Sequence, residues 1–592
     1  MKFSVIKDLE RHLAAEFNVE PPEISVERPP EDFEGDITVN SFRLARELRT
    51  NPMLIAEKAG AFSADHADVR NVKVVKAFVN IALQSAAVFR DTVADGAALM
   101  ADVQLPEAEQ QRILIEFSAP NTNKPQHLGH VRNNSLGQAT VSILKKAGHD
   151  VIPINLINDR GIHICKSMLA YQRFGNGETP GDAGIKGDHF VGNYYVKYDQ
   201  EFKRQAAELR RHKPSFDDKP DDELFLDTEI GRAAQQMLVD WENGDAKVRE
   251  LWKTMNGWVI EGFNQTYERM GVYFDKTYLE SETYGHGKEL IEKHLGEGIF
   301  RKRDDGAVVI DLEKEKLGSK VVLRSDGTSV YVTQDIGTTV LKQEDYDPDR
   351  QMWIVGDEQI YHFNVLFAIL KRLGYEWAEN LVHMPYGMVN LPSGKMKSRE
   401  GTVVDADDLF DEMEALARAA TLERVAEPPE DLDHRARVIG MAALKFMLLK
   451  VNAKTTMMFD PEASVKFEGD TGPYVLYACA RIASMRRKAE AVAIEGEVDW
   501  SVLGTPEEKD LALHCAQYGE TVRRAANELD TSGLAEYLLD LAKAFSRFYR
   551  ECPVLAAPEP KLVRARMELS LRVHEILKDG LDTLTIDVLE SM

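Results

Sequence analysis

Two histidines three residues apart, His127 and His130, are the side chains in this sequence best suited to phosphate chemistry. Residues at this spacing share one face of a helical turn, so both imidazoles can donate hydrogen bonds to a phosphate in its transition state. Gly129 lies between them and leaves room for a flat base or sugar. The ordinary alternative is a pair of surface histidines near a helix start, so the chemical interpretation depends on the surrounding elements.

Those elements are a strand before the histidines and a helix after them. The apolar run from Ile113 to Phe117 predicts a buried strand, and apolar residues at helical spacing continue through Leu144. A second apolar strand, Asp150 to Asn158, completes a βαβ unit with a right-handed crossover. Such a unit opens a nucleotide-binding sheet, and its helix N-terminus attracts phosphate.

A second stretch with chemical potential is S-G-K-M-K-S-R-E-G, which runs from Ser393 to Gly401. Two glycines enclose basic and hydroxyl side chains, among them Lys395 and Ser398, with no apolar periodicity. A cationic loop of this kind can contact phosphate, although most exposed basic loops are only solvated. Its place directly after the last predicted strand, Val382 to Val389, favours a role in the site.

Further polar side chains follow other predicted strands. The segment Ser329 to Asp335 is expected to end a strand on an acidic residue and to begin a helix. Met352 to Gly356 predicts another buried strand, followed by a helix near Gln359. Loops after parallel strands gather at one edge of the sheet, so Glu116, Tyr331, Asp335 and Gln359 are expected to converge there.

The remaining chain indicates several domains, as its 592 residues suggest. We expect an α/β protein with a Rossmann-type parallel-sheet catalytic domain, a helical insertion, a small N-terminal α/β domain and an all-helical C-terminal domain. The expected bounds are 1–108 for the N-terminal domain, 109–394 for the catalytic domain, 175–296 for the insertion, 395–465 for the basic loop and a connecting region, and 466–592 for the helical domain.

Composition limits the partners. A formal net charge of −25 argues against a broad basic surface for nucleic acid and, taken alone, favours a metabolic enzyme. The four cysteines form no C-x-x-C pair, so we expect a reducing cytoplasm and no structural zinc. No apolar run approaches a membrane span, and we therefore expect a cytoplasmic protein without a membrane partner.

H-L-G-H after a strand resembles the HIGH signature of class I aminoacyl-tRNA synthetases, and the upstream E-F-S-A-P-N-T-N-K-P resembles the arginyl-tRNA synthetase family. I-N-D-R-G-I-H-I, V-T-Q-D and D-T-G-P-Y agree in the same order along the chain. The basic loop resembles the KMSKS signature but has Ser398 where the consensus has lysine. In the family a lysine upstream of the histidines takes part of that role, and Lys124 stands there.

The resemblance implies two-step aminoacylation: ATP-dependent activation of L-arginine to arginyl-adenylate, then transfer to the 3′ adenosine of tRNA(Arg). ATP enters as a substrate with Mg²⁺, and no metal site in the protein is expected. The implied catalytic residues are His127, His130, Lys124 and Lys395. The implied ATP-binding residues are His127, Gly129, His130, Lys395 and Ser398.

Selection of arginine has its own physical demand. A guanidinium presents five N–H donors in one plane and keeps its charge, so its pocket needs carboxylates and neutral acceptors. By resemblance, Tyr331 and Asp335 hold the guanidinium side, while Glu116, Asn121 and Gln359 hold the amino-acid end. The preference for a binding role of Glu116 rests on its place inside a buried strand, where a carboxylate needs a cationic partner.

The C-terminal helices carry clustered cations in an otherwise acidic tail. They include Arg481, Arg486, Arg487 and Arg547, which are either solvated helix faces or contacts for tRNA. G-D-T-G-P-Y-V-L-Y-A resembles the start of the family's helical anticodon-binding domain, and this favours tRNA. The N-terminal F-E-G-D-I-T-V-N resembles the family's appended domain, which contacts the outer corner of the tRNA. We expect a monomer.

Three other functions compete with this interpretation. A nucleotidyltransferase of the wider H-x-G-H superfamily has little use for the long helical tail. A synthetase-like RNA-binding protein without catalysis has no physical need for both imidazoles. Another class I synthetase, such as the lysine enzyme of that class, is opposed by the E-F-S-A-P-N stretch and by the acceptors that a guanidinium demands.

Overall fold

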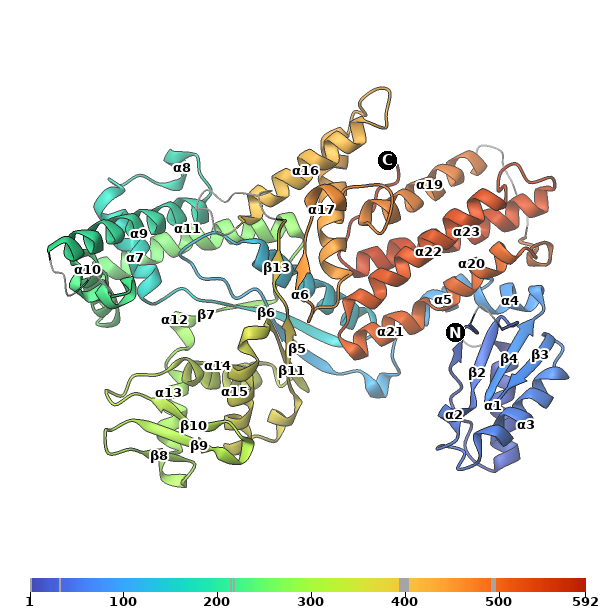
Figure 1. The fold of residues 1–592 in the computed structure, drawn as a ribbon, viewed down its shortest axis with the longest axis horizontal. Coiled ribbons are helices and arrows are strands. Elements are labelled where there is room, and N and C mark those ends of the chain that lie inside the picture. The colour runs from blue at the N-terminus through green and yellow to red at the C-terminus, as the bar shows by residue number, and fades with distance from the viewer. Residues whose placement is uncertain (1–2, 31–32, 213–215, 217–218, 393–403, 491–496) are drawn as a thin grey trace. The chain divides into compact units, whose positions relative to one another are not determined.

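The computed structural model describes all residues except 1–2, 31–32, 213–215, 217–218, 393–403 and 491–496 (Figure 1). The chain forms two compact units. The first combines residues 1–106, 420–446 and 465–592, and the second combines residues 107–419 and 447–464. Among the described residues, no helix is both long and apolar enough to cross a membrane.

The N-terminal part of the first unit is a four-stranded antiparallel sheet in the order β1-β2-β4-β3 with helices against it. Its elements are α1 (Ser4–Phe17), β1 (Val26–Glu27), β2 (Ile37–Asn40), α2 (Ser41–Leu44), α3 (Pro52–Ala64), β3 (Val69–Val75) and β4 (Phe78–Leu83). Asn51 caps α3 by accepting a hydrogen bond from the Met53 amide, and Pro52 is its first residue. The small α/β fold expected at this end of the chain is present.

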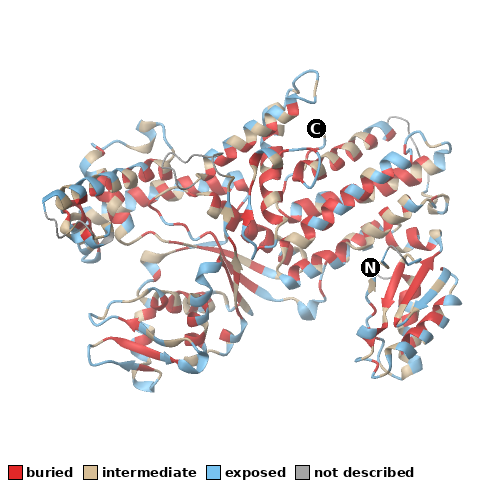
Figure 2. Cartoon of the chain, in the orientation of Figure 1, coloured by how far each residue is buried: buried red, intermediate tan, exposed pale blue. Residues whose placement is uncertain are grey.

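The rest of the first unit is helical. Its helices are α4 (Ser85–Thr92), α5 (Gly96–Ala101), most of α17 (Leu432–Leu449), α19 (Gly472–Glu490), α20 (Pro506–Ala516), α21 (Tyr518–Glu528), α22 (Thr531–Glu551) and α23 (Pro560–Thr583). Helix α22 shows why they pack. Its buried residues Leu534, Leu538, Leu541, Phe545 and Phe548 recur every three or four positions and form one apolar stripe. Figure 2 shows these helices buried along one side.

The second unit is organised around a five-stranded sheet in the order β12-β11-β5-β6-β7, in which every pairing is parallel. Its strands are β5 (Arg112–Glu116), β6 (Asp150–Ile157), β7 (Lys276–Leu279), β11 (Arg350–Gly356) and β12 (Leu381–Tyr386). The chain passes from β5 to β6 on one side and adds β11 on the other, so the strand order reverses at β5. Ligands bind at the carboxyl ends of strands at such a switch point. The Rossmann-type parallel sheet is confirmed.

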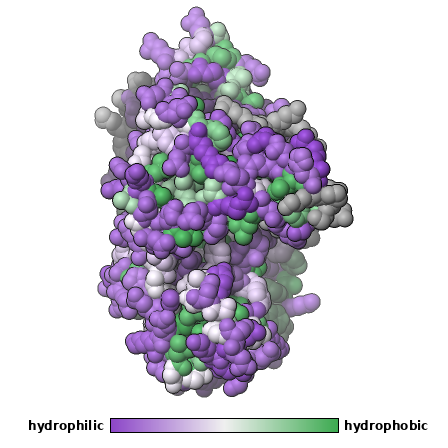
Figure 3. All heavy atoms as spheres, turned by 90° about the vertical axis from the view of Figure 1, so that its left-hand side faces the viewer, coloured by the Kyte–Doolittle hydropathy of each residue, from purple (hydrophilic) through white to green (hydrophobic). Residues whose placement is uncertain are grey.

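Helices and two small sheets surround this core. The helices are α6 (Leu128–Lys146), α7 (Ile162–Phe174), α8 (Pro180–Ala183), α9 (Gly187–His212), α10 (Glu229–Glu242), α11 (Ala246–Met270), α12 (Glu280–Thr283), α13 (His286–Lys293), α14 (Tyr331–Tyr346), α15 (Ile360–Arg372), α16 (Ala406–Leu422) and α18 (Pro461–Ser464). The additional strands are β8 (Phe300–Lys302), β9 (Val308–Leu312), β10 (Gly318–Leu323), β13 (Val389–Asn390) and β14 (Met457–Met458). Figure 3 shows a largely hydrophilic face with apolar side chains in small groups.

Two local predictions were wrong. β7 lies inside the interval 175–296 that was expected to be helical, because only Tyr278 of its four residues is buried and so short a segment shows no periodicity. Ser329 to Asp335 was expected to end a strand at Asp335 and to begin a helix; the helix is present, but α14 already begins at Tyr331, and only an isolated bridge at Ser329 precedes it. Val332 and Ile336, four residues apart, are both buried in the core beside β9 and β10, so packing overrides their preference for strands.

Candidate active site

The two histidines stand at the start of α6 and are held by backbone hydrogen bonds. His127 is the N-cap, and its Nδ1 accepts the amide of Gly129 at 3.1 Å. The amide of His127 in turn donates to Nδ1 of His130 at 3.2 Å, which closes a reciprocal cap. The ring centroids are 4.0 Å apart. The two imidazoles therefore form one unit fixed by the backbone.

This cap determines which nitrogen of each ring can donate. A ring nitrogen that accepts an amide hydrogen must carry a lone pair, so a neutral ring holds its proton on Nε2. Burial lowers the pKa of His127 to about 4. Burial, with the nearby charges of His127 and Lys124, lowers the pKa of His130 well below its usual value. At neutral pH both rings thus present a neutral Nε2–H donor.

Lys124 adds a positive charge beside this pair. Its charge helps to lower the pKa of His127, of His130 and of His163, which locates the ammonium near all three rings. The chain here packs tightly against Gly192 of α9. The two segments are so close that a β-carbon at position 192 would lie 2.9 Å from the Pro125 ring. Lys124 is therefore placed to meet an anion at the start of α6.

The loop that carries Lys395 and Ser398 lies outside the described residues, but the chain that follows it contacts the histidine segment directly. The carbonyl of Val404 accepts the Leu128 amide at 2.9 Å, and the amide of Ala406 donates to the Gln126 carbonyl at 3.0 Å. These bonds place Asp405 opposite His127 in an isolated antiparallel bridge. The described chain from Val404 to Ala406 therefore lies beside His127.

Arg132, further along α6, ties the same helix to two other backbone segments. Its guanidinium is fully buried and donates to the carbonyls of Met388 at 3.2 Å, Ala453 at 3.1 Å and Thr455 at 2.9 Å. The sequence analysis missed this residue. The sequence feature that could have revealed it is a cation on the apolar face of a predicted helix, because a buried cation requires hydrogen-bond partners.

The loop after β5 has an unusual backbone. Ser118 and Ala119 both have positive φ, 75° and 46°. Their amides donate to the side-chain oxygens of Asn133 at 2.6 Å and Asn155 at 3.0 Å. The amide group of Asn133 also donates to the Ile354 carbonyl on β11 at 2.7 Å. Strained backbone held in this way is typical of ligand sites.

Glu116, at the end of β5, has a cationic partner within the chain. Its Oε2 accepts a hydrogen bond from Lys342 of α14, and both side chains are buried. The Lys342 ammonium also lies 5.7 Å from the centroid of the Trp353 ring. The sequence argument for Glu116 was that its burial requires a cation, and Lys342 meets that requirement without a substrate.

Asp335 and Tyr331 lie one turn apart near the start of α14. Asp335 Oδ2 meets His362 Nε2 at 2.5 Å, and this hydrogen bond raises the pKa of His362. About a third of the Asp335 side chain is exposed, and Tyr331 is 74% exposed. Gln359, just before α15, is also exposed. These groups are accessible to a ligand at the carboxyl edge of the sheet.

Glu280, which the sequence analysis missed, belongs to the same edge. It follows β7 directly, and its pKa is raised to about 7, mainly by burial. The charges of Asp159 and Asp335 raise this pKa further, while Arg160 lowers it. Glu280 and Asp335 therefore lie close enough to interact. An acidic residue directly after a strand could have pointed to Glu280, but the strand itself, β7, was not predicted from the sequence.

Asn121 lies at the end of the neighbouring strand. It forms an isolated parallel bridge with Asn158, which follows β6, and its side chain is exposed. The amide of Asn158 donates to the Pro120 carbonyl at 3.0 Å, so the two strand ends are joined here. The structure thus brings Asn121 to the carboxyl edge of the sheet, where it was expected.

The four arginines of the helical tail differ in their surroundings. Arg481 donates to the Tyr477 hydroxyl at 2.7 Å and lies over the Tyr549 ring. Arg486 and Arg487 both contact Glu590 near the C-terminus, through its carboxylate at 3.2 Å and its carbonyl at 3.1 Å. Arg547 is more than half exposed, and its nearest carboxylate, on Asp510, is 3.9 Å away. Arg487 and Arg547 are thus the two of the four that are classed as exposed.

Comparison with known proteins gives one consistent result. Residues 96–461 match the family described as tRNA synthetases class I (R), catalytic domain. Residues 4–83 match the arginyl tRNA synthetase N terminal domain, and residues 475–592 match the DALR anticodon binding domain. Together these three matches cover most of the chain, with residues 84–95 and 462–474 between them.

Known proteins similar to this chain match it over nearly its whole length and theirs. The arginine–tRNA ligase of Bacteroides fragilis is 42% identical over 97% of this chain and 96% of its own length. That of Treponema denticola is 43% identical over 97% of this chain and 95% of its own. The solved structure of Thermus thermophilus arginyl-tRNA synthetase has a TM-score of 0.79 at 27% identity and covers 100% of both chains.

Proposed function

This chain belongs to the arginine–tRNA ligases, the class I tRNA synthetases for arginine, and on that premise we propose that it activates L-arginine with ATP and attaches it to the 3′ adenosine of tRNA(Arg). The family resemblance drawn from the sequence motifs is confirmed by these comparisons. The observation that carries the mechanism is the pair of neutral Nε2–H donors at the start of α6.

In the first step an oxygen of the arginine carboxylate attacks the α-phosphorus of ATP. A new P–O bond forms, the bond to the bridging oxygen breaks, and pyrophosphate leaves with those electrons. The imidazoles of His127 and His130 donate hydrogen bonds to the α-phosphate oxygens as negative charge builds up on them. Their backbone cap fixes both donors before the substrate arrives, so little reorganisation is needed during the reaction.

Cations offset the charge of the leaving group. The charge of Lys124 acts on His127, and Lys395 precedes, in the sequence, the described residues Val404 to Ala406 that are bonded to the histidine segment. We assign both to the departing pyrophosphate, and Gly129 and Ser398 to ATP contacts. Mg²⁺ enters with ATP as part of the substrate.

The guanidinium is assigned to the accessible carboxylates of the sheet edge. Asp335 and Tyr331 are the proposed acceptors, and the structure adds Glu280 because of its proximity to Asp335. Asn121 and Gln359 are proposed for the amino-acid end. Glu116 is retained there too, as one half of the pair with Lys342; the ammonium neutralises it and weakens its attraction for the substrate amino group.

The second step requires tRNA, which needs a larger surface. We assign the N-terminal domain, residues 1–108, to the tRNA corner, residues 395–465 to a connecting region, and residues 466–592 to the anticodon. Arg481, Arg486, Arg487 and Arg547 are the proposed phosphate contacts, of which Arg487 and Arg547 are exposed. The protein is proposed to act as a monomer.

The decisive experiment is arginine-dependent exchange of labelled pyrophosphate into ATP, with and without tRNA(Arg) and with lysine as the control amino acid. Exchange with arginine but not with lysine supports the proposed function. A requirement for tRNA would further show that RNA completes the site. No exchange under either condition, from a folded protein, would favour the RNA-binding alternative without catalysis.

A further inference from the structure

A partly buried network of charges lies just beyond the bridge between Asp405 and His127, and no step above uses it. The Lys186 ammonium, just before α9, donates to Asp188 Oδ2 at 3.1 Å, Thr266 Oγ1 at 2.5 Å and Asp407 Oδ2 at 2.6 Å. One cation therefore joins α9, α11 and the first turn of α16. All of these groups belong to the second unit.

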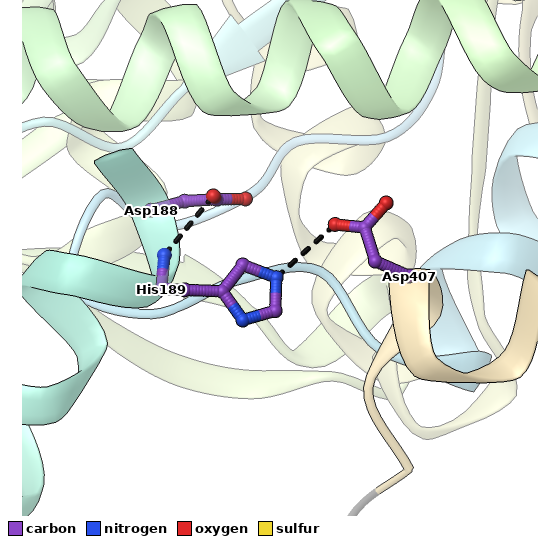
Figure 4. Close-up of side chains that lie close together, drawn as sticks. All are labelled: Asp188, His189 and Asp407. Atoms are coloured by element: carbon purple, nitrogen blue, oxygen red, sulfur yellow. Dashed lines mark hydrogen bonds and ion pairs between the residues drawn. The ribbon is translucent and has the colours of Figure 1, made fainter. Parts of the chain in front are cut away.

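Further contacts close the network around Asp407. His189 Nε2 lies 3.1 Å from Asp407 Oδ2, as Figure 4 shows, and Arg269 Nη1 lies 3.2 Å from its other oxygen. Burial raises the pKa of Asp407, but the hydrogen bonds and charges of His189 and Lys186 outweigh it and hold the carboxyl well below its usual pKa. Asp407 is thus an anion tightly held by the helical insertion.

Asp188, His189 and Asp407 have the donor types and spacing of a metal site, since one ligand atom from each lies within 4.8 Å of the others. The Lys186 ammonium, however, is bonded to Asp188 Oδ2 and to Asp407 Oδ2. A divalent cation would have to displace this ammonium and meet the charge of Arg269 nearby. The geometry therefore indicates a structural ion network and not a metal centre.

The network acts on the start of α16, and that start is bonded to the catalytic segment. Asp405 caps α16 by accepting the amides of Asp407 at 2.8 Å and Asp408 at 3.2 Å. Asp405 is also the residue opposite His127, held by hydrogen bonds on either side of it. A displacement of Asp407 therefore moves the backbone that supports the His127 cap.

We propose that Lys186 and Asp407 are positioning residues for the adenylation step, through which the helical insertion fixes the backbone of His127 and hence the orientation of both imidazoles. This inference rests on the proposed function of the two histidines. Its path has three contacts: the insertion to Asp407, Asp407 to Asp405, and Asp405 to His127. Neither Lys186 nor Asp407 touches the substrate in this path.

The first test is the pyrophosphate exchange rate of Lys186→Met and Asp407→Asn with saturating arginine and tRNA. Misplacing catalytic donors by a fraction of an ångström lowers the rate steeply, so we expect kcat/KM for ATP to fall about 10- to 100-fold. The KM for arginine should stay within about twofold. Lys186→Arg, which keeps the charge, should recover part of the loss.

A double variant separates coupling from general damage. If Lys186 and Asp407 act through one contact, Lys186→Met/Asp407→Asn should lose no more activity than the worse single variant. The matched control is Arg173→Met, which removes a bidentate pair between α7 and Glu229 of the insertion and does not involve Asp407. Arg173→Met should leave kcat/KM for ATP within twofold of the parent.

The second test observes the histidines without relying on activity. In protein labelled with ¹⁵N-histidine, the ring signals report the Nε2–H tautomer, and the His127 signal is assigned by its loss in His127→Gln. Lys186→Met should shift this signal, and Arg173→Met should not. If Lys186→Met fails to fold, both the exchange rate and the His127 signal are measured on the isosteric variant Asp407→Asn.

Two results would overturn the inference. One is a kcat/KM within twofold of the parent in both single variants. The other is a loss of activity that is accompanied by a lower melting temperature but by unchanged His127 signals. That combination would mean that Lys186 and Asp407 only stabilise the fold. If His127→Ala itself kept full exchange activity, the proposed function would fail instead, so the two failures are distinguishable.

Discussion

The start of α6 and the arginines of the helical tail hold their functional groups in opposite ways. At α6 the imidazoles are partly buried and fixed by backbone amides, which cannot move without the helix. In the tail, Arg486 is partly exposed and held by the carboxylate of Glu590 across a surface. The first arrangement suits a transition state that needs donors already in place, and the second suits a large ligand that displaces weak contacts.

The comparison predicts the largest loss at α6. His127→Ala or His130→Ala should lower the kcat of pyrophosphate exchange about 100- to 1,000-fold, because each removes one preorganised donor from the α-phosphate. The control is His212→Ala, which replaces an exposed histidine at the end of α9. Its melting temperature should change little, and its exchange rate should match that of the parent. A loss below tenfold in both α6 variants would remove them from the mechanism.

Substitution in the proposed guanidinium pocket should have nearly as large an effect, but on the KM for arginine and not on kcat. Asp335→Ala should raise the KM for arginine roughly 100-fold, since it removes a charged acceptor that a guanidinium requires. The KM for ATP should be unchanged. Glu344→Gln, on the exposed side of the same helix, is the control. Normal activation of arginine by Asp335→Ala would show that the pocket is wrongly assigned.

The buried state of His127 also predicts a pH effect on stability. Its pKa is lowered to about 4 in the folded protein from 6.5, so between these values the unfolded chain binds a proton that the folded chain does not. The free energy of unfolding should therefore fall by about 1.4 kcal/mol per unit as pH drops from 6.5 towards 4. His127→Gln should lack this contribution, as urea unfolding of both proteins across this range would reveal. Equal pH slopes would contradict the neutral, desolvated ring.

The smallest effect is expected in the tail. Glu590→Gln releases Arg486 and the nearby Lys578 from a carboxylate, so tRNA should bind about two- to fivefold more tightly at low salt. Filter binding in rising salt should show the gain disappearing. Glu551→Gln, which breaks an exposed pair with Arg550, is the matched control. Unchanged affinity at low salt would mean that these cations do not meet RNA phosphates.

Sequence patterns predicted the parts of the site that depend on neighbours in the chain. The strand, loop and helix around His127 follow from apolar spacing over a few dozen residues, and the structure confirms them. The partner of Glu116 could not be found in this way, because Lys342 is 226 positions away and a lysine in a helix usually points to water. Glu280 was missed because its strand has only four residues.

The order of strands in the parallel sheet has a consequence for synthesis. β5 has one neighbour, β6, within a few dozen residues, but its other neighbour, β11, begins with Arg350, which pairs with Ile113. At ribosomal rates of roughly 5–20 residues per second, the segment between them takes about 10–50 s to make. During that time the apolar β5 is an open sheet edge on a nascent chain, able to pair with a neighbouring copy. The interval between β5 and β11 is therefore a period in which two nascent chains can pair through this edge.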